Sequence, residues 1–192
     1  MKLLIVVASS TGRTRRMAEA AAEGAREAGA EAQLVEADVA GDADVLEADA
    51  VMLASAVHMG GMASAMRAFS ERLAPLWLQG KLVGKVGAVM ACGSAGSRGG
   101  AELALISMFS TLAEHGMLLV PMHNRLEGYS RAGCHWGPLV HANPPGGPAG
   151  PTEEDLVAAR SHGRWVAECT ARWLAGEAPA SSSPKRRTAG ES

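Results

Sequence analysis

The stretch that decides the fold lies near the amino terminus, where residues 3–14 read LLIVVASSTGRT. Its first half, Leu3–Ala8, is entirely apolar and carries β-branched residues in the middle, which is typical of a parallel strand buried on both faces. Its second half, residues 9–14, is rich in hydroxyl groups and contains one glycine. An Ala-rich stretch with helical spacing follows over residues 15–28. A buried strand, a polar turn and a helix in this order indicate the opening of an α/β fold.

The same alternation of strand and helix continues along the chain. Apolar segments predict four further strands, at residues 31–36, 50–55, 83–91 and 117–121. Helical spacing of apolar residues predicts helices over residues 62–73, over residues 103–113 and from Thr152 onward. Five strands that alternate with helices predict the α/β class, with an open, mainly parallel sheet and helices on both faces.

Two segments fall outside this alternation. Residues 123–151 are rich in Pro and Gly, and their length indicates a functional loop rather than a simple connection. Residues 177–192 are polar and rich in Ser and Ala, so we expect a disordered tail. The predicted domain therefore spans residues 1–176.

Charge and composition exclude several classes of protein. Eighteen Lys and Arg against 20 Asp and Glu leave a net charge of -2, without the basic excess of a nucleic-acid binder. No apolar run approaches the ~18 residues of a membrane helix, and no signal segment stands at the amino terminus. We therefore expect a cytoplasmic protein without membrane contact. The three cysteines and six histidines stand at neither disulfide nor metal-ligand spacing, so no metal site is predicted.

Three loops rich in small residues follow predicted strands, and parallel α/β sheets bind ligands at that edge. The first, residues 9–14, combines hydroxyl groups with Gly12 before a helix, which suits a phosphate group. It lacks the Gly-Lys-Ser/Thr ending of a P-loop. The second, residues 56–61, and the third, residues 93–100, would let backbone approach a flat ligand. An ordinary turn explains each loop alone, but together the three predict a ligand site.

Longer stretches make the chain resemble a known family. The most specific are residues 60–62 (GGM), 66–69 (MRAF), 76–77 (LW), 80–82 (GKL), 84–85 (GK), 99–102 (GGAE), 111–117 (TLAEHGM) and 136–138 (WGP). Through these stretches, and through scattered matches between Lys2 and Leu174, the chain resembles the WrbA family of FMN-dependent NAD(P)H:quinone oxidoreductases. The resemblance implies a flavodoxin-like, doubly wound fold whose five-stranded parallel sheet has the order 2-1-3-4-5. It also implies FMN as cofactor, NAD(P)H as electron donor, a quinone as substrate, and a homo-oligomer (dimer or tetramer) whose active sites draw on neighbouring subunits.

The same resemblance implies roles for individual residues. The positions that match its three FMN loops are Ser9, Ser10, Thr11, Gly12, Arg13, Thr14, Val57, His58, Met59, Gly60, Ser94, Ala95, Gly96, Ser97, Arg98 and Gly99. His115 matches a histidine beside the isoalloxazine ring, which implies a part in cofactor binding and catalysis. Trp77 matches an aromatic residue of the quinone and nicotinamide site. Read without the resemblance, His115 also fits a residue that complements a helix dipole, and Trp77 a core residue.

The chain departs from the family in two of these loops. Thr11 stands where the family usually has an aromatic residue. Ala56–Gly60 stands where the family usually reads Pro-Thr-Arg-Phe-Gly, so that His58 replaces the arginine and Met59 the phenylalanine.

The predicted reaction is a ping-pong, two-electron reduction of quinones by NAD(P)H, with the flavin as carrier. Two alternatives stay open. One is a flavodoxin-type one-electron carrier, against which the small net charge counts because steered docking favours a strongly charged patch. The other is a flavin-free binding or assembly module, which the replaced ring contacts at Thr11 and Met59 suggest.

Overall fold

The computed structural model describes residues 1–97, 99–142 and 149–176. Its strands are β1 (Lys2–Ala8), β2 (Glu31–Glu36), β3 (Ala50–His58), β4 (Gly61–Met62), β5 (Val86–Ser94), β6 (Leu118–Leu119), β7 (Gly133–Cys134) and β8 (Gly137–Ala142). Its helices are α1 (Arg13–Glu27), α2 (Asp42–Glu47), α3 (Ser64–Arg72), α4 (Ala74–Leu78), α5 (Gly100–Glu114), α6 (Tyr129–Ala132) and α7 (Glu153–Gly176). The tail predicted over residues 177–192 lies outside the described residues.

The sheet has the predicted doubly wound topology. Five strands run parallel in the order β2-β1-β3-β5-β8, which confirms the flavodoxin-like order and the predicted α/β class. Three short strands complete an eight-stranded sheet: β7 pairs antiparallel with β8, β4 pairs antiparallel with β3, and β6 lies beside β5. Ligand sites in this topology lie beyond the carboxyl ends of the parallel strands.

The fifth position of the sheet is filled differently from the prediction. Of the strand predicted over residues 117–121 only β6 forms, and it pairs with the first two residues of β5. The last four residues of β5 pair instead with β8, which lies within the expected loop 123–151. The sequence signal of β8 is weak, because Gly137 and Pro138 leave only Leu139 and Val140 as a clearly apolar pair. Two separate strands therefore share the fifth position of the sheet: β6 lies beside the start of β5, and β8 lies beside its end.

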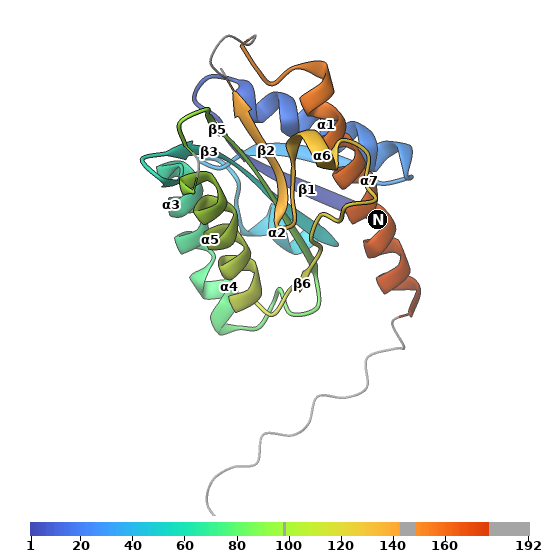
Figure 1. Ribbon diagram of the computed structural model, residues 1–192. Helices are drawn as coiled ribbons and strands as arrows, with labels where there is room; N and C mark the ends of the chain where they lie inside the picture. Colours follow the sequence, from blue (N-terminus) through green and yellow to red (C-terminus); the bar gives the residue numbers. More distant parts are fainter. Residues whose placement is uncertain (98, 143–148, 177–192) are drawn as a thin grey trace, which may run out of the picture.

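Two layers of helices enclose the sheet, as Figure 1 shows: α1 and α7 lie on one face, and α3, α4 and α5 on the other. Because successive side chains of a strand point to opposite faces, β1 supplies both cores. Leu3, Ile5 and Val7 belong to the apolar cluster that includes α1 and α7, whereas Leu4 and Val6 belong to the cluster with α3 and α5. This double burial is why β1 is apolar throughout.

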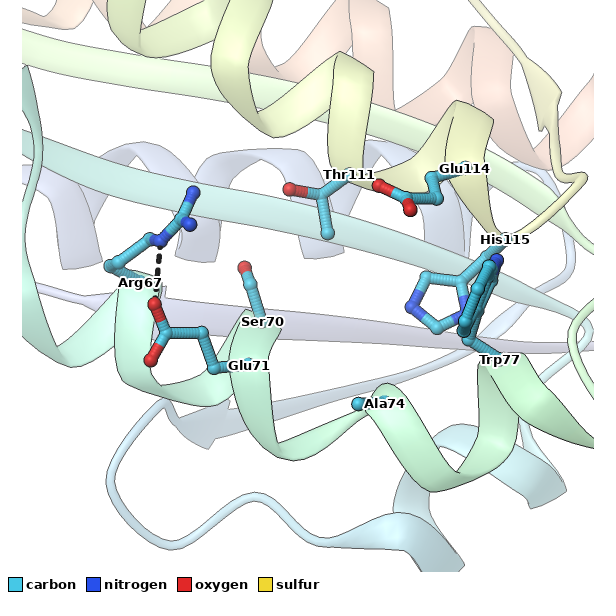
Figure 2. Close-up of a pocket in the computed structure, with 8 residues that line it drawn as sticks. All are labelled: Arg67, Ser70, Glu71, Ala74, Trp77, Thr111, Glu114 and His115. Carbon is cyan, nitrogen blue, oxygen red and sulfur yellow. Dashed lines mark hydrogen bonds and ion pairs between the residues drawn. The ribbon is translucent and has the colours of Figure 1, made fainter.

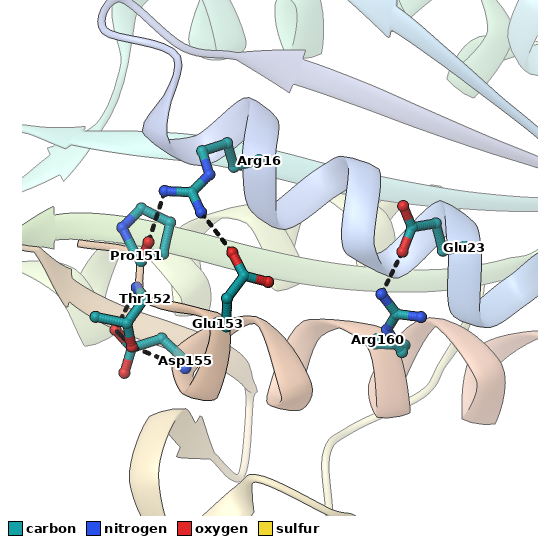
Figure 3. Close-up of polar contacts among 7 residues, drawn as sticks. All are labelled: Arg16, Glu23, Pro151, Thr152, Glu153, Asp155 and Arg160. Carbon is teal, nitrogen blue, oxygen red and sulfur yellow. Dashed lines mark hydrogen bonds and ion pairs between the residues drawn. The ribbon is translucent and has the colours of Figure 1, made fainter.

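Helices α1 and α7 touch through two glycines. A Cβ atom built on Gly163 would lie 2.0 Å from the carbonyl oxygen of Ala21, and one on Gly24 would lie 1.9 Å from the carbonyl oxygen of Arg160. The Arg160 side chain also forms an ion pair with Glu23 across the same interface (Figure 3). The backbones of the two helices therefore pack at a separation that only glycine permits.

The remaining differences are shifts of boundaries. The helix predicted over residues 62–73 is shorter, as α3, and is followed by α4. The polar connection over residues 38–47 contains the short helix α2. Strand β5 begins three residues later than predicted and extends to Ser94. Within the described parts of the chain, no helix combines the length and the apolar character needed to cross a bilayer.

Candidate functional site

The first predicted loop connects β1 to α1. Because α1 begins at Arg13, Arg13 and Thr14 lie in the first turn of the helix rather than in the loop. Gly12 has a φ of 78° and caps this helix, a conformation that glycine adopts without steric cost. The Arg15 N–H donates to Ser9 Oγ at 3.3 Å. The loop is therefore tied to the helix by its first hydroxyl group.

The start of α1 has the character of an anion site. Its first turn contains no acidic residue, and its N-cap residue, Gly12, has no side chain that could cap it. By contrast, α5 has Glu102 in its first turn, and α7 has a run of three acidic residues there. The side chains of Ser10 and Thr11, just before α1, are exposed. Helix N–H groups and hydroxyl groups together suit a phosphate group, so the residues of this loop fit the phosphate of FMN.

The second predicted loop is a tight hairpin between β3 and β4. Val57 and His58 are the last residues of β3, and His58 pairs with Gly61. Met59 and Gly60 form the turn with φ angles of 48° and 81°, and positive φ at both central residues is what a type I′ hairpin needs. The Met59 side chain is fully exposed, at 104% of its reference area. A strained residue that presents an apolar side chain to solvent is characteristic of a binding loop.

The third predicted loop follows β5. Ser94 is the last residue of that strand; Ala95, Gly96, Ser97 and Gly99 follow it, and Arg98 lies outside the described residues. The Ser97 N–H donates to the Ser94 carbonyl oxygen at 3.0 Å and closes the turn. A Cβ atom on Gly93 would lie 2.2 Å from Ser97 Oγ. The loop thus folds back on its own strand, and a Cβ atom at residue 93 would displace the Ser97 side chain.

The structure brings the three loops together at one edge of the sheet. Ser10 Oγ of the first loop lies 3.5 Å from His58 Nε2 of the second. A Cβ atom on Gly100, directly after the third loop, would lie 2.7 Å from the Cα atom of Gly60 in the second. At Gly60 and Gly96 an added Cβ atom would have no neighbour within 4 Å, so the space beside the backbone is open. The contiguous, glycine-lined edge fits a flat ring as well as a phosphate group.

His115 and Trp77 line a different pocket, shown in Figure 2. Its volume is about 330 Å³. The residues that line it are Arg67, Ser70, Glu71, Ala74, Trp77, Thr111, Glu114 and His115. His115 caps the carboxyl end of α5 and is only 6% exposed. Its Nδ1 atom is buried without a hydrogen-bond partner among the described residues, which is unusual for a purely structural histidine.

The end of this second pocket that contains His115 is remote from the three loops of the same chain. Helix α5 begins beside the third loop and has 15 residues, so its far end, at His115, lies about 22 Å away at ~1.5 Å per residue. One chain therefore does not bring His115 or Trp77 to the cofactor loops. The predicted site consists of two parts at opposite edges of the sheet.

Burial sets the charge of His115. It lowers the pKa of the imidazole below its ordinary value, and the negative charge of Glu114 only partly opposes this shift. The imidazole is therefore neutral at pH 7 and has one N–H to donate.

Several residues of the two pockets were not predicted. In the His115 pocket, Arg67, Ser70, Glu71 and Ala74 follow the spacing of one helical face and stand shortly before Trp77, a pattern that could have indicated a polar, pocket-facing surface. Beside the first two loops, a smaller pocket of about 160 Å³ adds Glu36 and Asp38 from the end of β2. Sequence alone gave no signal for that pair, because only the strand order places β2 next to β1.

No cysteine lines either of these two pockets. Cys92 is buried at the end of β5, and burial raises the pKa of its thiol to about 11, as expected of an inert core residue. In the described ranges no group of three or more His, Cys, Asp or Glu side chains could hold a metal ion.

Comparisons with known proteins agree with this geometry. Residues 5–117 match the family model described as Flavodoxin. The chain is 36% identical over 197 residues to NAD(P)H dehydrogenase (quinone) of Brucella anthropi, covering 90% of this chain and 98% of the relative. The protein of the same name from Brucella ovis matches equally. Among solved structures, the flavodoxin, WrbA-like protein from Agrobacterium tumefaciens superposes with a TM-score of 0.71 at 25% identity, covering 89% of this chain and 98% of that chain.

Proposed function

This chain belongs to the flavodoxin family, and we propose that it is an FMN-dependent NAD(P)H:quinone oxidoreductase. The observation that carries the proposal is the meeting of three ligand-binding loops at the carboxyl edge of β1, β3 and β5. The relatives named NAD(P)H dehydrogenase (quinone), which match over 90% of the chain, support the same activity.

The residues of the three loops would hold FMN in two parts. The hydroxyl groups of Ser10 and Thr11 and the first N–H groups of α1 would hold its phosphate. Backbone N–H groups of the second and third loops would face the ring, and Met59 would cover it as an apolar, polarisable side chain. When bound, FMN supplies the capacity to accept a hydride and to pass two electrons on.

The proposed reaction balances as follows. NAD(P)H gives up a hydride and leaves as NAD(P)⁺, and a quinone then enters, takes two electrons and two protons, and leaves as the hydroquinone. Because the hydride brings only one proton, the second comes from solvent. The neutral His115 imidazole would donate a hydrogen bond to a quinone oxygen and would direct that proton to it. Trp77 would offer its exposed ring as a stacking surface for the quinone or the nicotinamide.

A second copy of the chain would complete the site. His115 and Trp77 lie too far from the loops of their own chain, so we propose that they face the flavin loops of a neighbouring copy in a homo-oligomer. Leu103 and Ile106 support this, because α5 exposes these apolar side chains along its length between the two half-sites. Exposed apolar residues that line one helix are typical of an interface.

A flavin titration tests the cofactor. Addition of the purified chain to FMN is expected to quench the flavin fluorescence up to one FMN per chain. Absence of binding would contradict the proposal and would favour the flavin-free module.

A mixing experiment tests the shared site. Thr11→Glu places a negative charge in the phosphate loop and is expected to abolish FMN binding, while His115→Ala leaves the loops intact. Each variant alone should be nearly inactive, but refolding the two together should restore quinone reduction, because intact loops then face an intact His115. No restoration, with mixed oligomers demonstrated, would contradict the shared site.

A further inference from the structure

The first two loops are joined by a contact between two side chains. Ser10 Oγ lies 3.5 Å from His58 Nε2, at the outer limit of a hydrogen bond, and both side chains are exposed. Both also line the pocket of about 160 Å³ beside the phosphate loop. A titratable ring thus sits next to a hydroxyl group that would bind the cofactor phosphate.

The protonation state of the His58 ring affects whether the Ser10 hydroxyl group donates to the ring or to a bound phosphate. A serine hydroxyl has a single proton. When Nε2 of His58 carries no proton, it accepts the proton of Ser10, which is then not available to a phosphate. When the ring is an imidazolium, it donates to Ser10 Oγ instead, and the Ser10 proton points elsewhere. The imidazolium also adds a positive charge beside the bound anion.

The surroundings of His58 supply few other charges. From the end of β2, Glu36 and Asp38 line the same pocket, and Glu36 forms an ion pair with Arg15 of α1. From the start of α3, the pocket receives Ser64, and the first turn of that helix has no acidic residue. Asp38 lines the same pocket as His58 and adds a second carboxylate to it.

From this geometry we propose that His58 controls the affinity of the phosphate loop for FMN through Ser10, as a proton-dependent positioning residue. The protonated ring frees the Ser10 hydroxyl to donate to the phosphate, whereas a neutral ring with its proton on Nδ1 withdraws it. The proposal rests on the proposed function, since it requires FMN to bind at these loops. It adds a dependence on pH that a fixed arginine at the same position would not have, because arginine stays charged.

The test is a fluorescence titration of the full chain with FMN and, separately, with riboflavin, which lacks the phosphate, between about pH 5.5 and 8. The quantity compared is the ratio of the Kd of His58→Asn to the Kd of the wild-type chain. This ratio cancels the titration of the FMN phosphate itself. His58→Arg supplies a permanent charge, and His135→Asn removes an exposed histidine that lines neither pocket.

The proposal expects the FMN ratio to rise to about fivefold or more at the acid end and to approach unity at the alkaline end. The riboflavin ratio should stay flat, His58→Arg should lose the pH dependence of the wild type, and His135→Asn should keep it. A flat FMN ratio, or an equal slope for riboflavin, overturns the role of His58 while leaving the proposed function intact. Failure of every variant and of the wild type to bind FMN overturns both.

Discussion

Gly100 offers a direct way to separate the second and third loops by a known amount. A Cβ atom at this position would lie 2.7 Å from Cα of Gly60 and 3.3 Å from its carbonyl carbon and oxygen. These neighbours are backbone atoms, so no side-chain rotation can relieve the contact. Since carbon atoms pack at about 3.5–4.0 Å, the Gly100→Ala variant must move the two loops apart by roughly 1 Å.

The effect on function follows from that displacement. A misplacement of about 1 Å can cost about 100-fold in rate, so we expect quinone reduction by Gly100→Ala to fall by about two orders of magnitude. FMN, held between the two loops, should bind about tenfold more weakly, equivalent to ~1.4 kcal/mol. The measurements are a fluorescence titration with FMN and steady-state turnover at saturating FMN.

Gly176→Ala is the matched control. It changes a glycine at the end of α7, outside the three loops, and its Cβ atom would have no neighbour within 4 Å, so FMN affinity should stay close to that of the wild type. If Gly100→Ala binds FMN as tightly as Gly176→Ala, while both are folded by circular dichroism, the assignment of the ring to the space between these loops is wrong.

Three further predictions concern stability and the hairpin. Gly163→Ala should lower the free energy of unfolding by about 1–3 kcal/mol in urea denaturation, because its Cβ atom would collide with the carbonyl oxygen of Ala21. Burial lowers the pKa of His162 to about 4 from 6.5, so between these values the unfolded chain binds a proton that the folded chain does not. The free energy of unfolding should therefore fall by about 3 kcal/mol as the pH drops through this window, and His162→Gln should remove that part of the loss. Met59→Asn creates the Asn-Gly pair that type I′ turns favour and should raise the free energy of unfolding by up to about 1 kcal/mol, while FMN binds more weakly for lack of the apolar contact.

Each of these predictions has its own control and contrary result. Gly176→Ala, at the end of the same helix, has no neighbour within 4 Å of the new Cβ atom, and equal destabilisation by both variants would refute close helix contact. If the free energy of unfolding falls as steeply with decreasing pH in His162→Gln as in the wild type, His162 is not the source of the loss. If Met59→Asn lowers the free energy of unfolding in the absence of FMN, the turn is not type I′.

Local sequence patterns were sufficient for the parts of the fold that one segment determines. The apolar run of β1 is buried on both faces, so its composition alone identifies a central parallel strand. Strand β8 could not be found in this way, because only two of its residues are clearly apolar and its partner, β5, lies more than forty residues earlier, a separation visible in the pairing of Ala91 with Leu139. Long-range pairing, rather than local propensity, places that strand.

The candidate site shows the same limit. Each flavin loop follows a strand, so its place at the carboxyl edge follows from topology, and the structure brings the loops together as expected. His115 and Trp77 are different, since the direction and length of α5 carry His115 to the opposite edge of the sheet. No pattern within the three loops could reveal this separation, because it depends on the course of a helix that begins after them.

The most direct test of the account is anaerobic mixing of the FMN-loaded chain with NAD(P)H, followed by a quinone. If the protein is an NAD(P)H:quinone oxidoreductase, the flavin absorption should bleach rapidly on the first addition and return on the second, with one hydroquinone formed per flavin. Retained FMN that NAD(P)H does not bleach would contradict the oxidoreductase and would favour a one-electron carrier in its place.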